Sequence, residues 1–265
     1  MKQYGLIGEK LGHSLSVPIH QAIWEKLGIS ASYRLIEIPR AELREQVNTL
    51  LRTLDGFNVT VPYKTDVMPM LDALDPFAEK VGAVNTVTTG ERSCGYNTDA
   101  PGFEAMLHHF GMDAQGRRVF ILGSGGAMHA CRSAVWHMGA SSVLIVSRSP
   151  KQPDEITYDE FYARFPDEGG LLINTTPAGM YPHNDGCPIE ASQLEKIVSA
   201  ADGVADVIYN PPETVLTAAA KRAGTPAGTG LYMLIAQAVA AETIWQGYDM
   251  PANLAETLMK ELHLL

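Results

Sequence analysis

The sequence predicts an α/β fold in two lobes: an N-terminal α/β lobe with a mostly parallel sheet, onto which C-terminal helices pack back, and a second lobe with its own sheet. Three observations predict it. Short apolar runs alternate with helical patterns up to about residue 87, a second strand and helix series opens at Arg117, and the chain closes in two helical stretches. The length of 265 residues has room for two modest domains.

The first lobe begins with apolar runs at 3–8, 33–38 and 56–61, which have the length of buried strands. Helical patterns at 16–27 and 41–54 separate these runs, as in a sheet built from strand–helix–strand units. Ser16 is the expected N-cap of the first helix, because serine accepts a hydrogen bond from the first turn.

The second lobe begins with a strand, a glycine turn, a helix and another strand over residues 117–149. Apolar runs ending in polar turns follow at 170–179 and 204–212, and helices are predicted over Gly228–Gly247 and Pro251–Leu265. The predicted domains are residues 1–101 with 231–265, and residues 102–230.

Composition excludes several classes of protein. Hydrophobic residues make up 46% and charged residues 19%, and no apolar run is long enough to cross a bilayer, so we expect a soluble globular protein without a membrane partner. The polar start of the chain does not resemble a secretory signal, which favours a cytoplasmic location. Three widely spaced cysteines suggest reduced thiols and no metal site. A net charge of -10 disfavours nucleic acid as a partner.

A glycine turn connects the first strand and helix of the second lobe. Gly123, Gly125 and Gly126 would let the backbone approach a pyrophosphate at the N-terminus of a helix, as in a Rossmann-like nucleotide domain. The last small position of the usual fingerprint is occupied by Met128, so the match is imperfect.

The next strand indicates which nucleotide binds. NAD sites usually place an acidic side chain about 20 residues onward, whereas NADP sites place a basic one beside the 2′-phosphate. Here the strand ends in Ser147, Arg148 and Ser149, a guanidinium between two hydroxyls. We therefore predict NADP as the cofactor.

Four polar clusters in the first lobe, at 12–16, 58–64, 83–87 and 95–99, fall at predicted strand ends or turns. Ligands of α/β sheets bind outside the carboxyl ends of strands, so these clusters could meet. Most of their groups are hydroxyls and amides, which suit a substrate with several hydroxyl groups.

These motifs, taken in order, resemble the shikimate dehydrogenase family nearly from end to end. The resemblance rests on His-Ser-x-Ser at 13–16, Asn-Val-Thr-x-Pro-x-Lys at 58–64, Ala-Val-Asn-Thr at 83–86, Asn-Thr-Asp at 97–99, Gly-x-Gly-Gly-Ala at 123–127 and Gln237. It implies reduction of 3-dehydroshikimate to shikimate with NADPH, on the route through chorismate to the aromatic amino acids.

The resemblance also implies a set of site residues. Lys64 and Asp99 would be catalytic, and the substrate would be bound by Ser14, Ser16, Thr60, Asn85, Tyr209 and Gln237. The cofactor would be bound by Gly123, Ser124, Gly125, Gly126, Ala127, Ser147, Arg148, Ser149, Val207, Gly230 and Met233.

The sequence departs from the family's common pattern in four places: proline is common at the positions of Lys10 and Val17, asparagine at Gln21 and an aromatic residue at Glu242. These departures leave open a quinate/shikimate dehydrogenase with relaxed substrate or NAD use. A ligand sensor without activity and the folate-linked dehydrogenases are further alternatives. The sequence does not decide between a monomer and a homodimer.

Lys64 is assigned a chemical role because reduction of a carbonyl needs a proton at oxygen while hydride reaches carbon. An ammonium can donate that proton, and the neutral amine can accept it in reverse. Asp99 is expected to orient the side chain.

Overall fold

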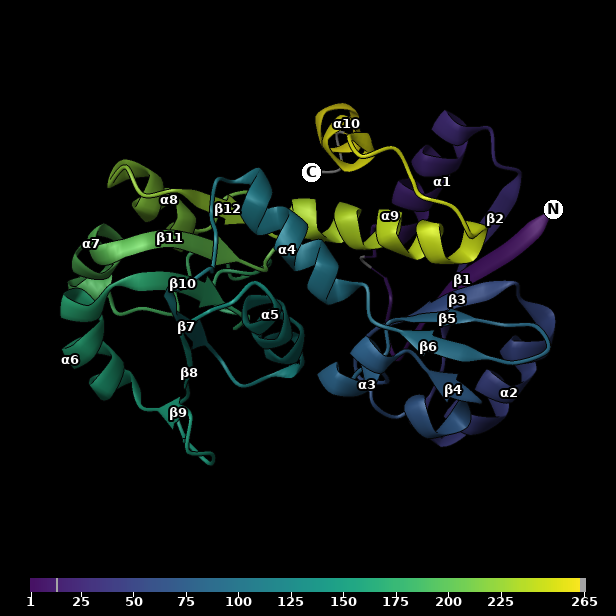
Figure 1. Cartoon of the computed structure of the whole chain (residues 1–265), viewed down its shortest axis with the longest axis horizontal. Coiled ribbons are helices and arrows are strands. Elements are labelled where there is room, and N and C mark those ends of the chain that lie inside the picture. Colours follow the sequence, from purple (N-terminus) through teal and green to yellow (C-terminus); the bar gives the residue numbers. More distant parts are fainter. Residues whose placement is uncertain (13, 263–265) are drawn as a thin grey trace. The chain divides into compact units, whose positions relative to one another are not determined.

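The structure, a computed structural model, describes residues 1–12 and 14–262. His13 of the predicted serine loop and the last three residues of the predicted C-terminal helix lie outside the described residues. The chain divides into two compact units, one formed by Met1–Pro101 with the segment that begins at Ile235, the other by Gly102–Leu234. In this division the return to the first unit falls at Ile235, inside a helix. Figure 1 labels the elements of both units.

The first unit contains a six-stranded sheet in the order β2-β1-β3-β5-β6-β4. Its strands are β1 (Lys2–Gly8), β2 (Ala31–Glu37), β3 (Gly56–Val59), β4 (Ala73–Leu74), β5 (Thr86–Thr88) and β6 (Cys94–Tyr96). β1 pairs in parallel with β2 and β3, and β4 pairs in parallel with β6. β5 runs antiparallel to both of its neighbours, so the predicted mostly parallel sheet contains one reversed strand.

Helices cover both faces of this sheet (Figure 1). They are α1 (Ser16–Leu27), η1 (Arg40–Glu42), α2 (Leu43–Thr53), η2 (Met68–Met70), α3 (Pro76–Val81), the later part of α9 (Leu231–Gln246) and α10 (Leu254–Glu261). Phe57 and Val59 join the core under α2. Side chains alternate along a strand, so Asn58 points to the opposite face, towards α1 and α9. The Trp245 indole donates to the carbonyl of Val87 at 3.0 Å, which fixes α9 on the sheet and confirms the predicted packing of the C-terminal helices.

The start of α1 differs from the prediction. The helix begins at Ser16, the residue before it is Leu15, and no side chain caps it. The Ser14 hydroxyl instead accepts from the Ser16 amide at 3.2 Å and donates to the Ser16 hydroxyl at 3.1 Å. The predicted N-cap role of Ser16 is wrong because Ser16 is already helical and bonds back to Ser14.

The second unit contains six parallel strands in the order β12-β11-β10-β7-β8-β9. They are β7 (Arg118–Leu122), β8 (Ser142–Val146), β9 (Glu155–Ile156), β10 (Gly170–Asn174), β11 (Ala201–Asp206) and β12 (Ala227–Thr229). Numbered within the unit, this is the 3-2-1-4-5-6 order of dinucleotide-binding sheets, whose crevice lies where the order reverses. That point falls between β7 and β10.

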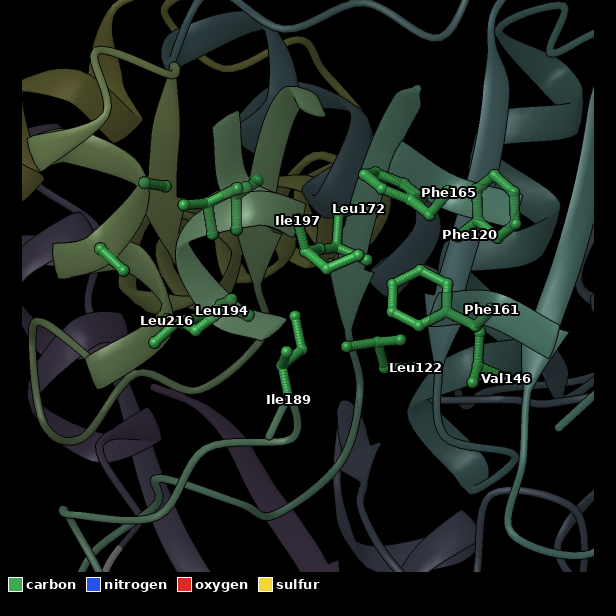
Figure 2. Close-up of a cluster of buried hydrophobic side chains, with 14 of the residues drawn as sticks. Phe120, Leu122, Val146, Phe161, Phe165, Leu172, Ile189, Leu194, Ile197 and Leu216 are labelled. Carbon is green, nitrogen blue, oxygen red and sulfur yellow. The ribbon is translucent and has the colours of Figure 1, made fainter. Parts of the chain in front are cut away.

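The helices of the second unit are α4 (Asp99–His109), α5 (Gly126–His137), α6 (Tyr158–Glu168), α7 (Ala191–Ala200), α8 (Val215–Arg222) and the first turn of α9. The core between the sheet and α6, α7 and α8 is aliphatic and aromatic (Figure 2). Phe120 of β7 packs against Phe161 and Phe165 of α6, with ring centroids 5.7 and 5.0 Å away.

The predicted helix at 228–247 is partly wrong, since Ala227–Thr229 forms strand β12 and α9 begins at Leu231. A Cβ on Gly228 would lie 2.0 Å from the Phe110 ring. Gly228 thus lets a strand approach an aromatic ring, a tertiary contact that helical spacing in the sequence cannot reveal.

The described part of the chain contains no helix that is long and apolar enough to cross a membrane. No group of three or more His, Cys, Asp or Glu side chains in it could hold a metal ion.

Candidate active site

Polar groups of the first unit meet at one edge of its sheet. β3 ends there, β5 begins there because it is antiparallel to β3, and β6 returns there because it is antiparallel to β5. The clusters that follow β3, open β5 and follow β6 are therefore neighbours. The cluster at β5 joins this edge at the amino end of its strand, because β5 is antiparallel to both neighbours.

Lys64 and Asp99 form an ion pair at this edge, with 2.7 Å between Lys64 Nζ and Asp99 Oδ2. The side chains are 28% and 14% exposed, so the ammonium is held and still reachable from solvent. The Lys64 carbonyl accepts from the Val84 amide at 2.8 Å, which fixes the backbone of the lysine. A charge-assisted hydrogen bond of this length orients the amine.

Asn85 connects the pair to the rest of the cluster. Its side-chain amide donates to Asp99 Oδ1 and to the Thr98 hydroxyl, both at 2.9 Å. Its side-chain oxygen, Oδ1, accepts from the Thr98 backbone amide at 2.7 Å. Both oxygens of Asp99 are thus engaged, one by an amine and one by an amide, which restricts rotation of the carboxylate.

Gln237 of α9 reaches the same cluster from the C-terminal part of the chain. Its Oε1 lies 3.5 Å from the Asn85 side-chain nitrogen and 3.5 Å from the Thr98 hydroxyl, at the long limit for hydrogen bonds. The structure therefore brings together Lys64, Asp99, Asn85 and Gln237 from positions more than 170 residues apart in the sequence.

The other predicted substrate residues of this unit lie on the turns around the sheet. Thr60 follows β3, and its amide donates to the Ile7 carbonyl at 2.9 Å. Its methyl group packs against Gly8, where a Cβ would lie only 2.8 Å away. Ser14 and Ser16 bond to each other at the start of α1. Tyr209 belongs to the other unit, after β11, where burial raises the pKa of its phenol.

The glycine turn of the second unit presents bare backbone at the start of α5. A Cβ at Gly125 or Gly126 would meet nothing within 4 Å, and both residues are exposed with Ser124 and Ala127. No side chain caps α5 and its first turn has no acidic residue. Free amides and the positive end of the helix dipole suit an anion such as a pyrophosphate.

Gly123 shapes this turn and requires glycine. Its φ is +98°, a left-handed value, and a Cβ would lie 2.9 Å from the Thr176 methyl. Thr175 donates to the Leu122 carbonyl at 2.8 Å, tying the end of β10 to the end of β7. The turn thus lies at the reversal of strand order, where a dinucleotide sheet binds its ligand.

Arg148 follows β8, one strand further out, and is exposed with Ser149. The Ser147 hydroxyl accepts from the Ser149 amide at 3.2 Å, so Ser147 shapes the turn. The two acidic residues at neighbouring β9 are engaged elsewhere: Asp154 pairs with Arg132 at 2.6 Å, and Glu155 accepts from the Lys151 amide at 2.7 Å.

The remaining predicted cofactor residues also belong to the second unit. Gly230 donates to the Ile208 carbonyl at 2.8 Å, and a Cβ there would lie 2.1 Å from the Val207 carbonyl oxygen. The two predicted residues Val207 and Gly230 are therefore in contact through backbone. Met233 lies in the first turn of α9 and is partly buried.

Sequence reasoning missed two groups of residues at these sites. Thr98 bonds to Asn85, although the sequence assigned a role in that motif only to Asp99. The position of Thr98 inside the Asn-Thr-Asp motif could have indicated its part in the cluster. Thr175 and Thr176 contact the glycine turn from 50 residues away, and no local pattern indicates that contact.

Comparisons of the sequence and of the structure with known proteins point to the same family. Residues 6–87 match the model of the shikimate dehydrogenase substrate binding domain. The chain is 36% identical over 265 residues to a shikimate dehydrogenase (NADP(+)) of Clostridium beijerinckii, covering 97% of each protein.

Solved structures agree. A chorismate mutase/shikimate 5-dehydrogenase fusion protein from Clostridium acetobutylicum is similar with a TM-score of 0.91 and 37% identity, covering 98% of this chain and 96% of that one. Shikimate 5-dehydrogenase from Thermus thermophilus, in complex with NADP(H) and shikimate, is similar with a TM-score of 0.85 and 29% identity, covering 99% and 100%.

Proposed function

Because the chain belongs to the shikimate dehydrogenase family, we propose that it is an oxidoreductase that reversibly reduces 3-dehydroshikimate to shikimate with NADPH, a step of chorismate and aromatic amino-acid biosynthesis. The observation that carries the proposal is the Lys64–Asp99 pair inside a cluster of amides and hydroxyls. A sensor that only binds its ligand has no need of an oriented proton donor.

Lys64 is the general acid of the reduction and the general base of the reverse reaction. Its ammonium donates a proton to the carbonyl oxygen of 3-dehydroshikimate as that oxygen becomes a hydroxyl, and its amine takes the proton back when shikimate is oxidised. Asp99 holds the amine in place, and Asn85 holds Asp99. The carboxylate also stabilises the charge that returns to the lysine in the oxidation.

The substrate is bound by groups that match its chemistry. Asn85, Thr60, Gln237 and Tyr209 offer hydrogen bonds to ring hydroxyls, and the hydroxyls of the serine loop, Ser14 and Ser16, offer hydrogen bonds to a carboxylate. These assignments come from the family motifs and are supported by the joining of Asn85 and Gln237 in one cluster.

The second unit fits NADP. The open backbone of the glycine turn suits the pyrophosphate, exposed Arg148 and Ser149 suit the 2′-phosphate, and Val207, Gly230 and Met233 would lie beside the nicotinamide. Bound NADPH supplies the hydride that reaches the carbonyl carbon. On this assignment, the substrate domain consists of residues 1–101 with 231–265 and the dinucleotide domain of residues 102–230.

The proposal includes a cytoplasmic enzyme that acts as a monomer or homodimer on small molecules. Its composition and acidic charge are those of a soluble enzyme that binds no nucleic acid.

The direct test is a set of four initial rates with purified protein: oxidation of shikimate or quinate, each with NADP⁺ or NAD⁺. We expect the highest kcat/KM for shikimate with NADP⁺. A preference for quinate with NAD⁺ would overturn the assignment of substrate and cofactor. Binding of shikimate without any turnover would overturn the assignment as an enzyme.

A further inference from the structure

The face of the first sheet that is covered by α1 and α9 contains a buried pair of ionisable side chains, a histidine and a glutamate. Nδ1 of His20, on α1, lies 2.7 Å from Oε1 of Glu242, on α9, and both side chains are 0% exposed. Burying such a pair is costly compared with apolar residues of similar size. We therefore infer that Glu242 has a structural role that the aromatic residue common at this position in the family could not fill.

The pair fixes the imidazole in one orientation against Tyr33. The rings of His20 and Tyr33 stack with centroids 4.4 Å apart and planes 13° apart, and Trp245 lies on another side at 5.4 Å. Because Glu242 accepts from the imidazole, the ring cannot turn without losing a buried hydrogen bond. The His20 imidazole, fixed by Glu242, therefore restrains the ring of Tyr33 that stacks on it.

The Tyr33 hydroxyl leads to the candidate active site. It donates to Asn58 Oδ1 at 2.7 Å, and Asn58 Nδ2 donates to the Asn85 carbonyl at 3.1 Å and to the Thr86 hydroxyl at 3.0 Å. Asn58 is therefore fixed at both ends of its amide. Removing the Tyr33 hydroxyl would leave Asn58 Oδ1 buried without this donor.

The Tyr33 hydroxyl keeps its proton. Burial holds the pKa of Tyr33 well above its ordinary value, the charge of Glu242 raises it further, and a hydrogen bond with the Ser16 side chain lowers it. The phenol therefore stays protonated, which it must be to donate to Asn58. Through Asn58 it reaches the backbone of Asn85, a predicted substrate-binding residue just before β5.

We propose that Tyr33, clamped by the buried His20–Glu242 pair, is a positioning residue that sets Asn85 in register for the substrate. Tyr33 does not touch the reacting atoms and acts through Asn58. The inference deepens the proposed function and rests on it for the kinetic part of its test.

The sharpest variant is Tyr33→Phe, which keeps the ring that stacks on His20 and removes only the hydroxyl. We expect kcat/KM for shikimate to fall about fivefold, the effect of one hydrogen bond, with KM for NADP⁺ unchanged within about twofold. Tyr162→Phe is the matched control, since it removes a phenol that accepts from the Glu190 amide at 3.0 Å in the other unit. The control should keep both constants within about twofold.

A second readout does not depend on turnover. In protein labelled with ¹⁵N-asparagine, Tyr33→Phe should shift the side-chain amide resonances of Asn58 and Asn85, and Tyr162→Phe should shift neither. Unchanged resonances for Asn85 in Tyr33→Phe, or equal losses of kcat/KM in the two variants, would overturn the inference. Absence of turnover in the parent would refute the proposed function instead, and the resonances would still decide the positioning role.

Variants of Glu242 test the clamp. Glu242→Gln keeps an oxygen that accepts from His20 and should stay within about twofold of the parent in kcat/KM. Glu242→Met has a similar volume and no such acceptor, and should reproduce the fivefold loss and the shift of the Asn58 resonance. Equal behaviour of the two variants would show that the pair has no positioning role.

Discussion

The two sheets of this protein have the same number of strands and offer opposite kinds of site. In the first unit one reversed strand, β5, brings polar side chains from three strand termini into mutual hydrogen bonds, so the site consists of side chains that restrain one another. In the second unit all strands are parallel, and the reversal of strand order leaves exposed backbone amides and an exposed arginine.

We infer that the two units meet different requirements. A proton donor must be held at one angle, which needs side chains that are themselves held. A dinucleotide is long and carries several charges, so backbone amides, a helix dipole and one cation suffice to hold it. The contrast makes separate predictions for the two units.

The largest effect is expected at Lys64. Lys64→Ala should lower kcat for shikimate oxidation about 10² to 10⁴-fold, because the general acid and base is lost, with the affinity for NADP⁺ retained. Lys221→Ala is the control, since Lys221 pairs with Glu213 at the same 2.7 Å but both side chains are more than half exposed. Turnover by Lys64→Ala equal to that of the control variant would contradict the role of the lysine.

A buried carboxylate should make the second unit sensitive to pH. Asp206 is fully buried, and among the described residues its hydrogen-bond donors are the neutral groups of Asn174, Thr214 and the Ile208 amide. Burial raises its pKa from 3.8 to about 6. The folded form therefore holds the proton more tightly than the unfolded form. The stability contributed by the protonated group is complete below about pH 4 and is lost as the pH rises through about 6.

The measurement is urea unfolding of the parent and Asp206→Asn across this range. Relative to the variant, the parent's free energy of unfolding should fall by about 2 to 3 kcal/mol between about pH 4 and about pH 7. A constant difference between the two proteins would show that Asp206 does not titrate there.

The smallest of these effects concerns the choice of cofactor. Arg148→Gln should raise KM for NADP⁺ about 10- to 100-fold, the effect of one hydrogen bond to a charged group, and leave KM for NAD⁺ unchanged. Arg222→Gln, which alters an exposed arginine paired with Glu195, is the control. An equal rise for both cofactors in Arg148→Gln would mean that the arginine does not recognise the 2′-phosphate.

Ordered local motifs predicted much of the candidate site. The strand ends and the glycine turn are encoded within a few residues of chain, so they were visible in the sequence. Lys64 and Asp99 lie in motifs 35 residues apart, and only the resemblance to the family linked them. The reversed strand β5 and the short strand β12 were missed. Three residues carry too little periodicity to identify a strand, and only pairing with neighbours makes them one.

The sequence by itself determined the α/β class, the family and the residue types proposed to bind substrate and cofactor, because turns and strand ends are encoded in short local patterns. Only the tertiary structure decided which of these residues touch. Asn85 and Asp99 bond because an antiparallel strand reverses the chain between them, and His20 finds Glu242 because a C-terminal helix returns to the first sheet. Such contacts depend on packing between distant segments, which no local pattern contains.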